Sequence, residues 1–309
     1  MPPFSSVAVN AQCNGSAQGC PALSFVALNA GSFEMGNDQN ANESPVHTVS
    51  IPALELTRSE VTVGQYRTCV NAGQCTLPSE IDTADATYTA QAGQYENHPV
   101  NFVNWSQAKA FATWVGGRLP TESEWEYAAR SEGKTNTYPW GEGVPSCDRV
   151  NAFDCNGAPV EVCSYPLGQT EQLLCDMAGN LYEFVEDDAI GTYTGAPDDG
   201  RAWVNEPRSS TRGDRGGGFR ATNERIRTAW RSYSDNGNTA ATLGFRVARD
   251  TLSACSADDS GAPLSPQCAD GCCPIIDFVE LEGGDFSMGA DDLSARELPI
   301  HDVSILSFE

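Results

Sequence analysis

The chain has 309 residues, of which 40% are hydrophobic and six are tryptophan, so it has enough apolar material for one large core or two smaller ones. Its formal net charge of −24 argues against nucleic acid and anionic membrane surfaces as partners, because both would repel a field of that sign, and it leaves calcium as a natural partner. No apolar run has the length of a membrane span, so we expect no membrane insertion.

The twelve cysteines form close pairs along the chain. An even number of cysteines in short local loops indicates disulfides formed in an oxidising compartment. Zinc is the alternative, but the chain has only three histidines and no repeated C-x2-C pair at finger-like spacing. We therefore predict a secreted protein, located outside the cell, at the cell surface or in the periplasm, with its export signal removed. The predicted pairs are Cys13 with Cys20, Cys69 with Cys75, Cys147 with Cys155, and Cys163 with Cys175.

Residues 1–24 are small, polar and cysteine-containing, which indicates an N-terminal linker. Two alternating runs, FVALNAGSFEMG at 25–36 and VHTVSIPALEL at 46–56, predict a β-hairpin. Three helices are expected next, at Ser59–Asn71 with Ser59 as the N-cap, at Asn104–Trp114, and at Thr121–Ser131, which opens with the capping-box spacing of Thr121 and Glu124. The rest is rich in Gly, Pro and Asn, so we predict an irregular α+β fold with much loop.

The segment Arg212–Asp250 is cationic inside an acidic chain. Ten of the eighteen Lys and Arg residues lie between Arg201 and Arg249. The planar fork of arginine binds carboxylates or glycans and stacks on aromatic rings, so we predict a ligand-binding surface in this segment. The alternative is that its arginines bond to carbonyls and acidic loops and stabilise the fold. The candidate ligand-binding residues are Arg220, Asn223, Arg225, Arg227, Trp230 and Arg231.

The first hairpin recurs near the C-terminus, where FVELEGGDFSMG at 278–289 matches 25–36 and ELPIHDVSI at 297–305 matches 43–51. This repeat predicts one domain at 25–250, a Cys-rich linker at 251–276, and the first hairpin of a second, incomplete repeat at 277–309. Two strands bury too little surface to fold alone. Either the second repeat is cut short here, or the hairpin packs on a neighbouring subunit.

Four motifs in one order give the sequence a specific resemblance: HPVNFVNWSQAKAFATWVGGRLPTESEWEYAARS, TYPWGEG, CDMAGNLYEFVED, and RGGGF followed by LGFRVARD. They resemble the formylglycine-generating enzyme family, also called the sulfatase-modifying-factor family. The resemblance implies an irregular C-type-lectin-like α+β fold with low regular secondary structure and bound calcium. Carboxylates and turn carbonyls are the oxygens that calcium prefers. The matching positions are Asp176, Gly179, Leu181 and Glu183 for one calcium, and Asn151, Ala152 and Asp154 for a second.

Catalytic members of the family oxidise a substrate cysteine to formylglycine with a copper ion held by two cysteines, because Cu(I) prefers sulfur ligands. The corresponding positions here are Ala221 and Ile226, and no cysteine lies between Cys175 and Cys255. The resemblance therefore implies calcium without copper. Other catalytic signatures, such as a P-loop, an H-E-x-x-H pair and a G-x-S-x-G turn, are absent from the sequence.

These observations predict a secreted, non-catalytic domain of the sulfatase-modifying-factor type that acts as a binding or structural module. Its expected partner is a protein or glycan ligand. Copies of the chain are a further expected partner, contacted through the C-terminal hairpin in a tandem or head-to-tail assembly, because an exposed hairpin edge can add to another sheet. The alternative is an enzyme of the same family with altered, non-copper chemistry.

Overall fold

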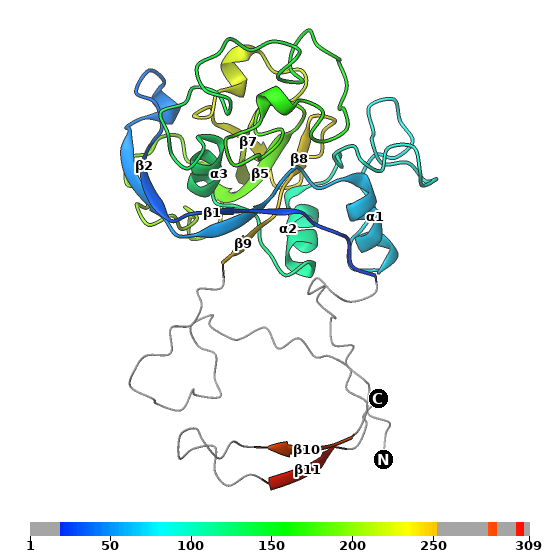
Figure 1. The fold of residues 1–309 in the computed structure, drawn as a ribbon. Coiled ribbons are helices and arrows are strands. Elements are labelled where there is room, and N and C mark those ends of the chain that lie inside the picture. Colours follow the sequence, from blue (N-terminus) through cyan, green and yellow to red (C-terminus); the bar gives the residue numbers. More distant parts are fainter. Residues whose placement is uncertain (1–18, 252–283, 289–300, 306–309) are drawn as a thin grey trace. The chain divides into compact units, whose positions relative to one another are not determined.

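The computed structural model describes residues 19–251, together with the backbone of two strands at 284–288 and 301–305. The chain divides into two compact units, Met1–Thr251 and Leu252–Glu309. The first unit combines helices and short strands with long irregular loops (Figure 1), which confirms the predicted α+β class. Among the residues described, no helix has the length and apolar character needed to cross a bilayer.

The first unit begins with four strands, β1 (Phe25–Leu28), β2 (Gly31–Met35), β3 (His47–Ile51) and β4 (Leu54–Thr57). The predicted hairpin is confirmed, because β2 pairs with β3 in antiparallel register from Gly31 opposite Ile51 to Met35 opposite His47. Strand β4 pairs with β1 on one side and with β9 (Ala248–Asp250) on the other. The two ends of the domain are therefore joined in one sheet.

The cationic segment supplies three strands of a four-stranded sheet. Its order is β7 (Ser232–Asp235), β6 (Thr211–Arg215), β5 (Tyr182–Asp188) and β8 (Leu243–Phe245). Strand β5 runs antiparallel to β6 and parallel to β8. The motif CDMAGNLYEFVED, which the resemblance assigns to a calcium site, runs into β5. Strand β5 therefore lies between β6 and β8, two strands supplied by the cationic segment.

Three helices follow the hairpin: α1 (Val63–Asn71), α2 (Trp105–Trp114) and α3 (Glu122–Ala129). The predicted capping box of α3 is confirmed, since the side chains of Thr121 and Glu124 each accept from the other residue's backbone amide. Asn104 forms the same reciprocal capping box with Gln107 at the start of α2. The predicted start of α1 is wrong. Thr62, not Ser59, is its N-cap, because the Thr62 side chain accepts from the Gln65 amide and the Gln65 side chain reaches back.

Helix α3 is buried along its whole length, and it packs against β2, β3, β5 and β6. We expected Trp125 to be buried, and it is, with none of its side chain exposed. Glu122, Glu124 and Glu126 are also buried, which the pattern of the sequence does not indicate. Burial of a carboxylate is costly unless it is paired. These acids therefore need arginine partners from elsewhere in the chain.

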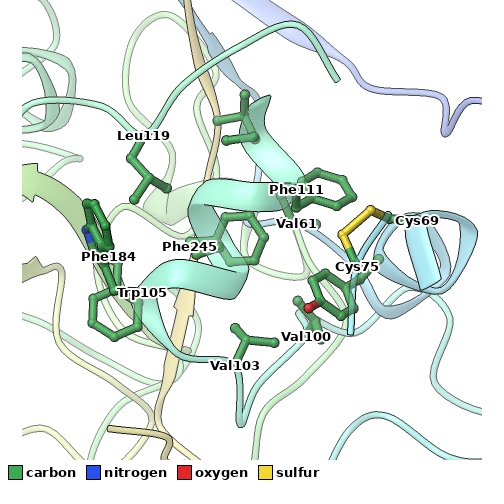
Figure 2. Packing of buried hydrophobic residues seen from close by; sticks show 14 of the residues in the cluster. Val61, Cys69, Cys75, Val100, Val103, Trp105, Phe111, Leu119, Phe184 and Phe245 are labelled. Carbon is green, nitrogen blue, oxygen red and sulfur yellow. A yellow bond between two sulfur atoms is a disulfide. The ribbon is translucent and has the colours of Figure 1, made fainter. Parts of the chain in front are cut away.

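The main apolar core lies between α1, α2 and the sheet (Figure 2). Phe111 of α2 stacks on Tyr66 of α1 and meets Phe245 of β8 edge-on, with ring centroids 5.8 Å and 5.5 Å apart. The disulfide between Cys69 and Cys75 closes the end of α1 at the margin of this core.

The predicted disulfides Cys69–Cys75, Cys147–Cys155 and Cys163–Cys175 are confirmed. Cys20 is also disulfide-bonded, and its predicted partner Cys13 lies outside the described residues.

The second unit contributes the strands β10 (Gly284–Met288) and β11 (His301–Ile305). They pair antiparallel from Gly284 opposite Ile305 to Met288 opposite His301. This register matches, position by position, that of β2 and β3 in the first unit. The remainder of the predicted linker and repeat lies outside the described residues.

Candidate functional site

The cationic segment begins with a turn of three glycines after β6. Gly216 and Gly217 have φ angles of +90° and +73°, the left-handed region that favours glycine. A Cβ atom on Gly217 would lie 2.7 Å from the carbonyl oxygen of Arg225, so no larger residue fits. The turn therefore packs directly on the short helix η3 (Asn223–Ile226), which holds the candidate ligand-binding residues Asn223 and Arg225.

Ala221 and Ile226 flank this turn. They are 4% and 0% exposed, and they belong to a small apolar cluster with Val150, Ala152 and Ala178. A cluster of alkyl side chains offers no lone pairs to a metal ion.

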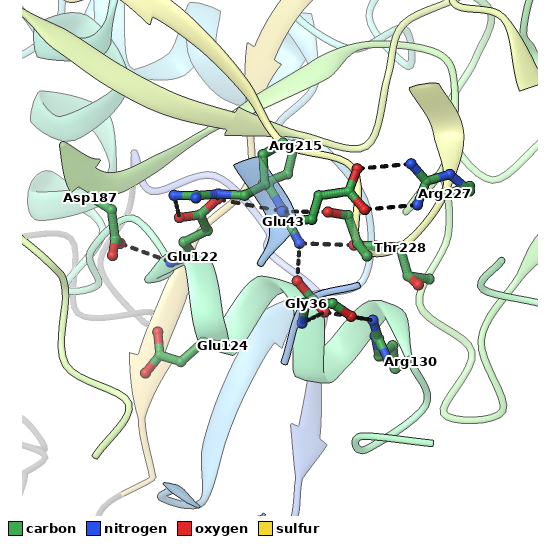
Figure 3. A network of polar contacts seen from close by, with 12 residues as sticks. Gly36, Glu43, Glu122, Glu124, Arg130, Asp187, Arg215, Arg227 and Thr228 are labelled. Carbon is green, nitrogen blue, oxygen red and sulfur yellow. Dashed lines mark hydrogen bonds and ion pairs between the residues drawn. The ribbon is translucent and has the colours of Figure 1, made fainter. Parts of the chain in front are cut away.

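Two of the six candidate ligand-binding residues are buried in ion pairs (Figure 3). Arg231 contacts both carboxylate oxygens of Glu122 at 2.7 and 2.8 Å, and Arg227 contacts both oxygens of Glu43 at 2.9 and 2.8 Å. Arg227 is 8% exposed and Arg231 is 2% exposed. Both guanidiniums are thus engaged by carboxylates of the protein, and ligand contact by these two arginines stays a prediction. They compensate the buried acids of α3 and of the short helix η1 (Ala41–Glu43).

Arg215 and Arg246 extend the same pattern. Arg215 donates to the Glu126 carboxylate at 2.5 Å, and the fork of Arg246 contacts both oxygens of Glu183 at 2.6 Å. Both arginines are fully buried. The alternative interpretation of the cationic segment, that its arginines stabilise the fold, thus holds for its buried members.

The other four candidates reach the surface. Arg220, Asn223 and Arg225 are exposed and Trp230 is half-buried. The Arg225 guanidinium lies 5.9 Å from the centre of the Trp230 ring, and Arg220 pairs with Asp85 at 3.2 Å. These four residues form what we call the arginine surface.

Aromatic side chains border the arginine surface. Tyr138 and Trp140, from the TYPWGEG motif, are half-buried and stack with ring centroids 5.1 Å apart. The Tyr138 hydroxyl donates to the Asn223 carbonyl at 3.5 Å. Phe153 is 57% exposed, and its amide donates to the Ala221 carbonyl. The two aromatic residues of TYPWGEG are visible in the sequence, but the sequence does not show that their rings stay half-exposed.

The first predicted calcium loop is a buried acidic site. Glu183 is fully engaged, because Arg246 contacts both of its oxygens and the Trp125 indole nitrogen also donates to it at 2.8 Å. Asp176 accepts the Cys163 amide at 2.7 Å, and burial raises the pKa of Asp176 to about 6. Burial and the Asp176 charge together raise the pKa of Glu60 well above its usual range.

This loop fits a calcium ion only in part. Glu60, Asp176 and Glu183 place three carboxylates around one Arg246, and a cation would relieve that excess. However, no group of three or more His, Cys, Asp or Glu side chains among the described residues has metal-binding geometry. Glu183 acts as the partner of Arg246, which leaves Asp176 and backbone carbonyls as oxygen donors. The calcium expectation thus stays a prediction, and no reaction step depends on it.

The second predicted calcium loop packs on the first. A Cβ atom on Gly179 would lie 2.4 Å from the Asn151 carbonyl oxygen. That oxygen accepts the Asn180 amide at 2.8 Å, and the Asn151 side-chain oxygen accepts from Asn156 at 3.2 Å. Asp154 is exposed, whereas Ala152 is buried. Both oxygens of Asn151 thus accept hydrogen bonds within the protein.

The first unit is a C-type-lectin-like domain, with short sheets and few helices that hold long loops. Residues 11–251 match the sulfatase-modifying factor enzyme 1-like domain, and the chain belongs to that family. It is 28% identical over 305 residues to the formylglycine-generating enzyme of Thermomonospora curvata, covering 75% of this chain and 95% of that protein.

It is also 34% identical over 242 residues to the serine/threonine-protein kinase Pkn1 of Chlamydia trachomatis, covering 73% of this chain. The match spans only 38% of that kinase. Among solved structures, PvdO from Pseudomonas aeruginosa is similar, with a TM-score of 0.65 and 28% identity over 76% of this chain and 96% of PvdO. These matches confirm the predicted family and fold.

Proposed function

We propose that this domain is a binding module that contacts a protein or glycan ligand through the arginine surface. The observation that carries the proposal is the division of the cationic segment into buried and exposed residues. Arg227 and Arg231 are held in ion pairs, while Arg220, Asn223 and Arg225 reach solvent beside a stacked aromatic pair. Arginine and aromatic side chains on one surface are typical of protein contact sites.

The proposal that the module is non-catalytic rests on the sequence and on the apolar cluster. Ala221 and Ile226 stand where the resemblance places two sulfur ligands, and both are packed among alkyl groups. The family also contains enzymes such as the formylglycine-generating enzyme of T. curvata, so altered chemistry is the second candidate. Oxygen consumption with a cysteine-containing peptide, measured with and without added copper, distinguishes them. Turnover would establish the enzyme.

The binding proposal is tested with Arg220→Ala/Arg225→Ala against the matched control Arg201→Ala. Arg201 is also an arginine of this region, with 73% of its side chain exposed, and lies outside the arginine surface. Both proteins are screened against arrays of extracellular proteins and glycans. We expect ligands of the native protein to be lost in the double variant and kept in the control. Equal binding by all three proteins would refute the role of the arginine surface.

Calcium at Asp176, with the carbonyls of Gly179 and Leu181 as further ligands, is part of the proposal. The excess of buried carboxylates supports it. A bound ion stabilises the folded state by mass action, so millimolar calcium should raise the unfolding midpoint relative to excess EGTA. Asp176→Asn should remove that increase, whereas Asp199→Asn, at an exposed position, should keep it. An unfolding midpoint that is the same in calcium and in EGTA would rule out a calcium ion at this site.

The proposal includes export from the cytoplasm and an assembly through the second unit. Three local disulfides support the first. The shared register of the hairpins β2–β3 and β10–β11 supports the second, because a hairpin of the same pattern can occupy the same place on another copy. Mass photometry of the full chain and of Phe286→Asp tests the assembly. Oligomers in the native chain, lost in the variant, are expected, and identical monomers in both would exclude it.

A further inference from the structure

A polar pocket opens next to the arginine surface, where the turn after β2 meets the loop before Tyr138 and the segment after Arg227. Its volume is about 250 Å³. Figure 3 shows Gly36, Arg130, Arg227 and Thr228 around this region. The complete lining is Gly36, Asn37, Asp38, Val46, Arg130, Thr135, Asn136, Thr137, Arg227, Thr228 and Ala229. The volume is below that of pockets for drug-sized ligands, so it suits one small ring.

The two arginines of the pocket are charge-matched. Arg130 contacts Glu126 at 2.8 Å and donates to the Gly36 carbonyl at 2.9 Å. Arg227 is held by both oxygens of Glu43, and it also contacts Glu224. Because each guanidinium already has a carboxylate partner, the wall of the pocket carries no surplus positive charge. This arrangement disfavours recognition of an anion.

Hydroxyl and amide side chains form one part of the lining, which we call the rim: Thr135, Asn136, Thr137 and Thr228. Thr228 donates its hydroxyl to the Asn136 carbonyl at 2.8 Å, and Thr137 donates its hydroxyl to Glu142 at 2.7 Å, so both hydroxyl oxygens keep acceptor capacity. Asn136 adds a side-chain amide, which both donates and accepts. Such groups match ligand hydroxyls, which also donate and accept.

A buried polar atom also points to a ligand or water at this place. Arg130 is 8% exposed, and its Nε atom has no hydrogen-bond partner among the described residues. A buried donor without a partner is costly, so an oxygen acceptor is expected nearby.

Two residues that line the pocket are followed in the chain by aromatic residues outside the lining. Thr137 is followed by Tyr138, the first member of the stacked pair with Trp140, and Ala229 is followed by Trp230. An aromatic face can bury the C–H face of a sugar ring, while the polar rim binds its hydroxyl groups. The polar lining and these aromatic residues are thus neighbours in the chain.

We infer that this pocket binds one neutral monosaccharide unit of a glycan, and that the neighbouring aromatic rings contact the next unit. The inference rests on the proposed binding function, because it assigns the ligand class of the arginine surface. Of the six candidate ligand-binding residues, Arg227 alone is in the lining of this pocket.

The test uses the full chain and methyl glycosides of glucose, galactose, mannose, N-acetylglucosamine and glucuronic acid, followed by saturation-transfer NMR and calorimetry. Thr135→Val and Asn136→Ala change the rim, and Thr113→Val is the control at an exposed position of α2. We expect binding of at least one neutral glycoside, weakened about three- to tenfold by each rim variant, the size of one lost hydrogen bond, and unchanged in the control.

Three results would overturn the inference: no neutral glycoside binds, only the glucuronide binds, or the rim variants bind as well as the control. The Arg220→Ala/Arg225→Ala protein separates this failure from that of the proposed function. If that protein loses a ligand that the rim variants keep, the arginine surface stands and the pocket does not. If none of the variants changes the binding of any ligand, both proposals fail.

Discussion

At the scale of single residues, the arginines of the cationic segment divide into a buried set and an exposed set. Arg215, Arg231 and Arg246 are fully buried and paired with carboxylates, whereas Arg220 and Arg225 lie at the surface. The chemistry of the side chain is the same in both groups. An arginine that is buried with a carboxylate partner stabilises the domain, whereas an arginine that is exposed to water is available to a ligand.

Arg231→Met should be strongly destabilising. It leaves the buried Glu122 carboxylate without its bidentate partner, and an unpaired buried charge costs about 3–5 kcal/mol. The measurement is the free energy of unfolding in urea. Arg201→Met, at a side chain that is 73% exposed, should change it by less than about 0.5 kcal/mol. A small effect at Arg231 would mean that Glu122 accepts a proton or another partner at little cost.

Asp214 should make the stability depend on pH. It is 1% exposed, and burial raises its pKa to about 6 despite the hydrogen bond from Ser234. The folded state thus holds this proton more tightly than the unfolded state, so stability is lost as pH rises from about 4 to about 6. Relative to Asp214→Asn, the native protein should lose up to about 3 kcal/mol across that window. Parallel pH profiles of the two proteins would contradict this assignment.

At the scale of elements, the local parts of the fold could be predicted and the distant pairings could not. The boundaries of α2 and α3 follow from Asn104 and Thr121, whose capping partners lie three residues away. The start of α1 was misplaced, because Glu60, which follows the predicted cap, binds the amide of Leu181 instead. The parallel pairing of β5 with β8 left no periodic signal, since its partners are far apart in the chain.

The candidate site was affected by the same limit. The exposed arginines lie in the segment that the sequence indicates, but burial of Arg227 depends on Glu43, which lies in a different part of the chain. The aromatic border was missed because nothing in TYPWGEG says which face of its turn is covered. Patterns along the chain fix residue type and spacing, while burial depends on the packing of distant elements.

The two hairpins allow a test of cross-strand pairing. In β2–β3, Thr48 donates its hydroxyl to Glu34 at 2.5 Å. At the equivalent register positions of β10–β11, Ser287 lies opposite Asp302, so the hydroxyl and the acid have exchanged strands. Glu34→Ser and Thr48→Asp should each destabilise the domain, and the double variant should recover about 0.5–1 kcal/mol. A double-mutant cycle from urea unfolding measures this coupling, and purely additive effects would show that the pair contributes nothing.

At the scale of the whole molecule, the disulfides stabilise individual loops and not the packing of helices against sheets. The three described in full have sequence separations of 6, 8 and 12 residues: one joins α1 to the loop that follows it, and two lie within the long connection between α3 and β5. The layers themselves are held by the apolar core and by ion pairs between distant segments. Reduction should therefore loosen loops first and leave the helices and sheets partly protected.

Cys163→Ala/Cys175→Ala should cost about 3 kcal/mol, the loop-closure entropy expected for a loop of this size, and more than Cys69→Ala/Cys75→Ala, whose loop is shorter. Urea unfolding measures both costs, and hydrogen exchange locates the change. Removal of the longer loop closure should increase exchange around Asp176, whose carboxylate accepts the Cys163 amide. Equal costs for the two pairs would argue against the entropic explanation.

The glycine turn and the buried ion pairs have a consequence for how this domain can change over time. Gly217 fixes the path of the chain before η3, and the ion pairs of Arg227 and Arg231 fix it afterwards. Between these fixed points, Arg220, Asn223 and Arg225 contribute side chains to solvent and little to the core. Substitutions at these three positions can therefore accumulate without unfolding the protein, and a lineage can acquire a new ligand while it keeps the same scaffold.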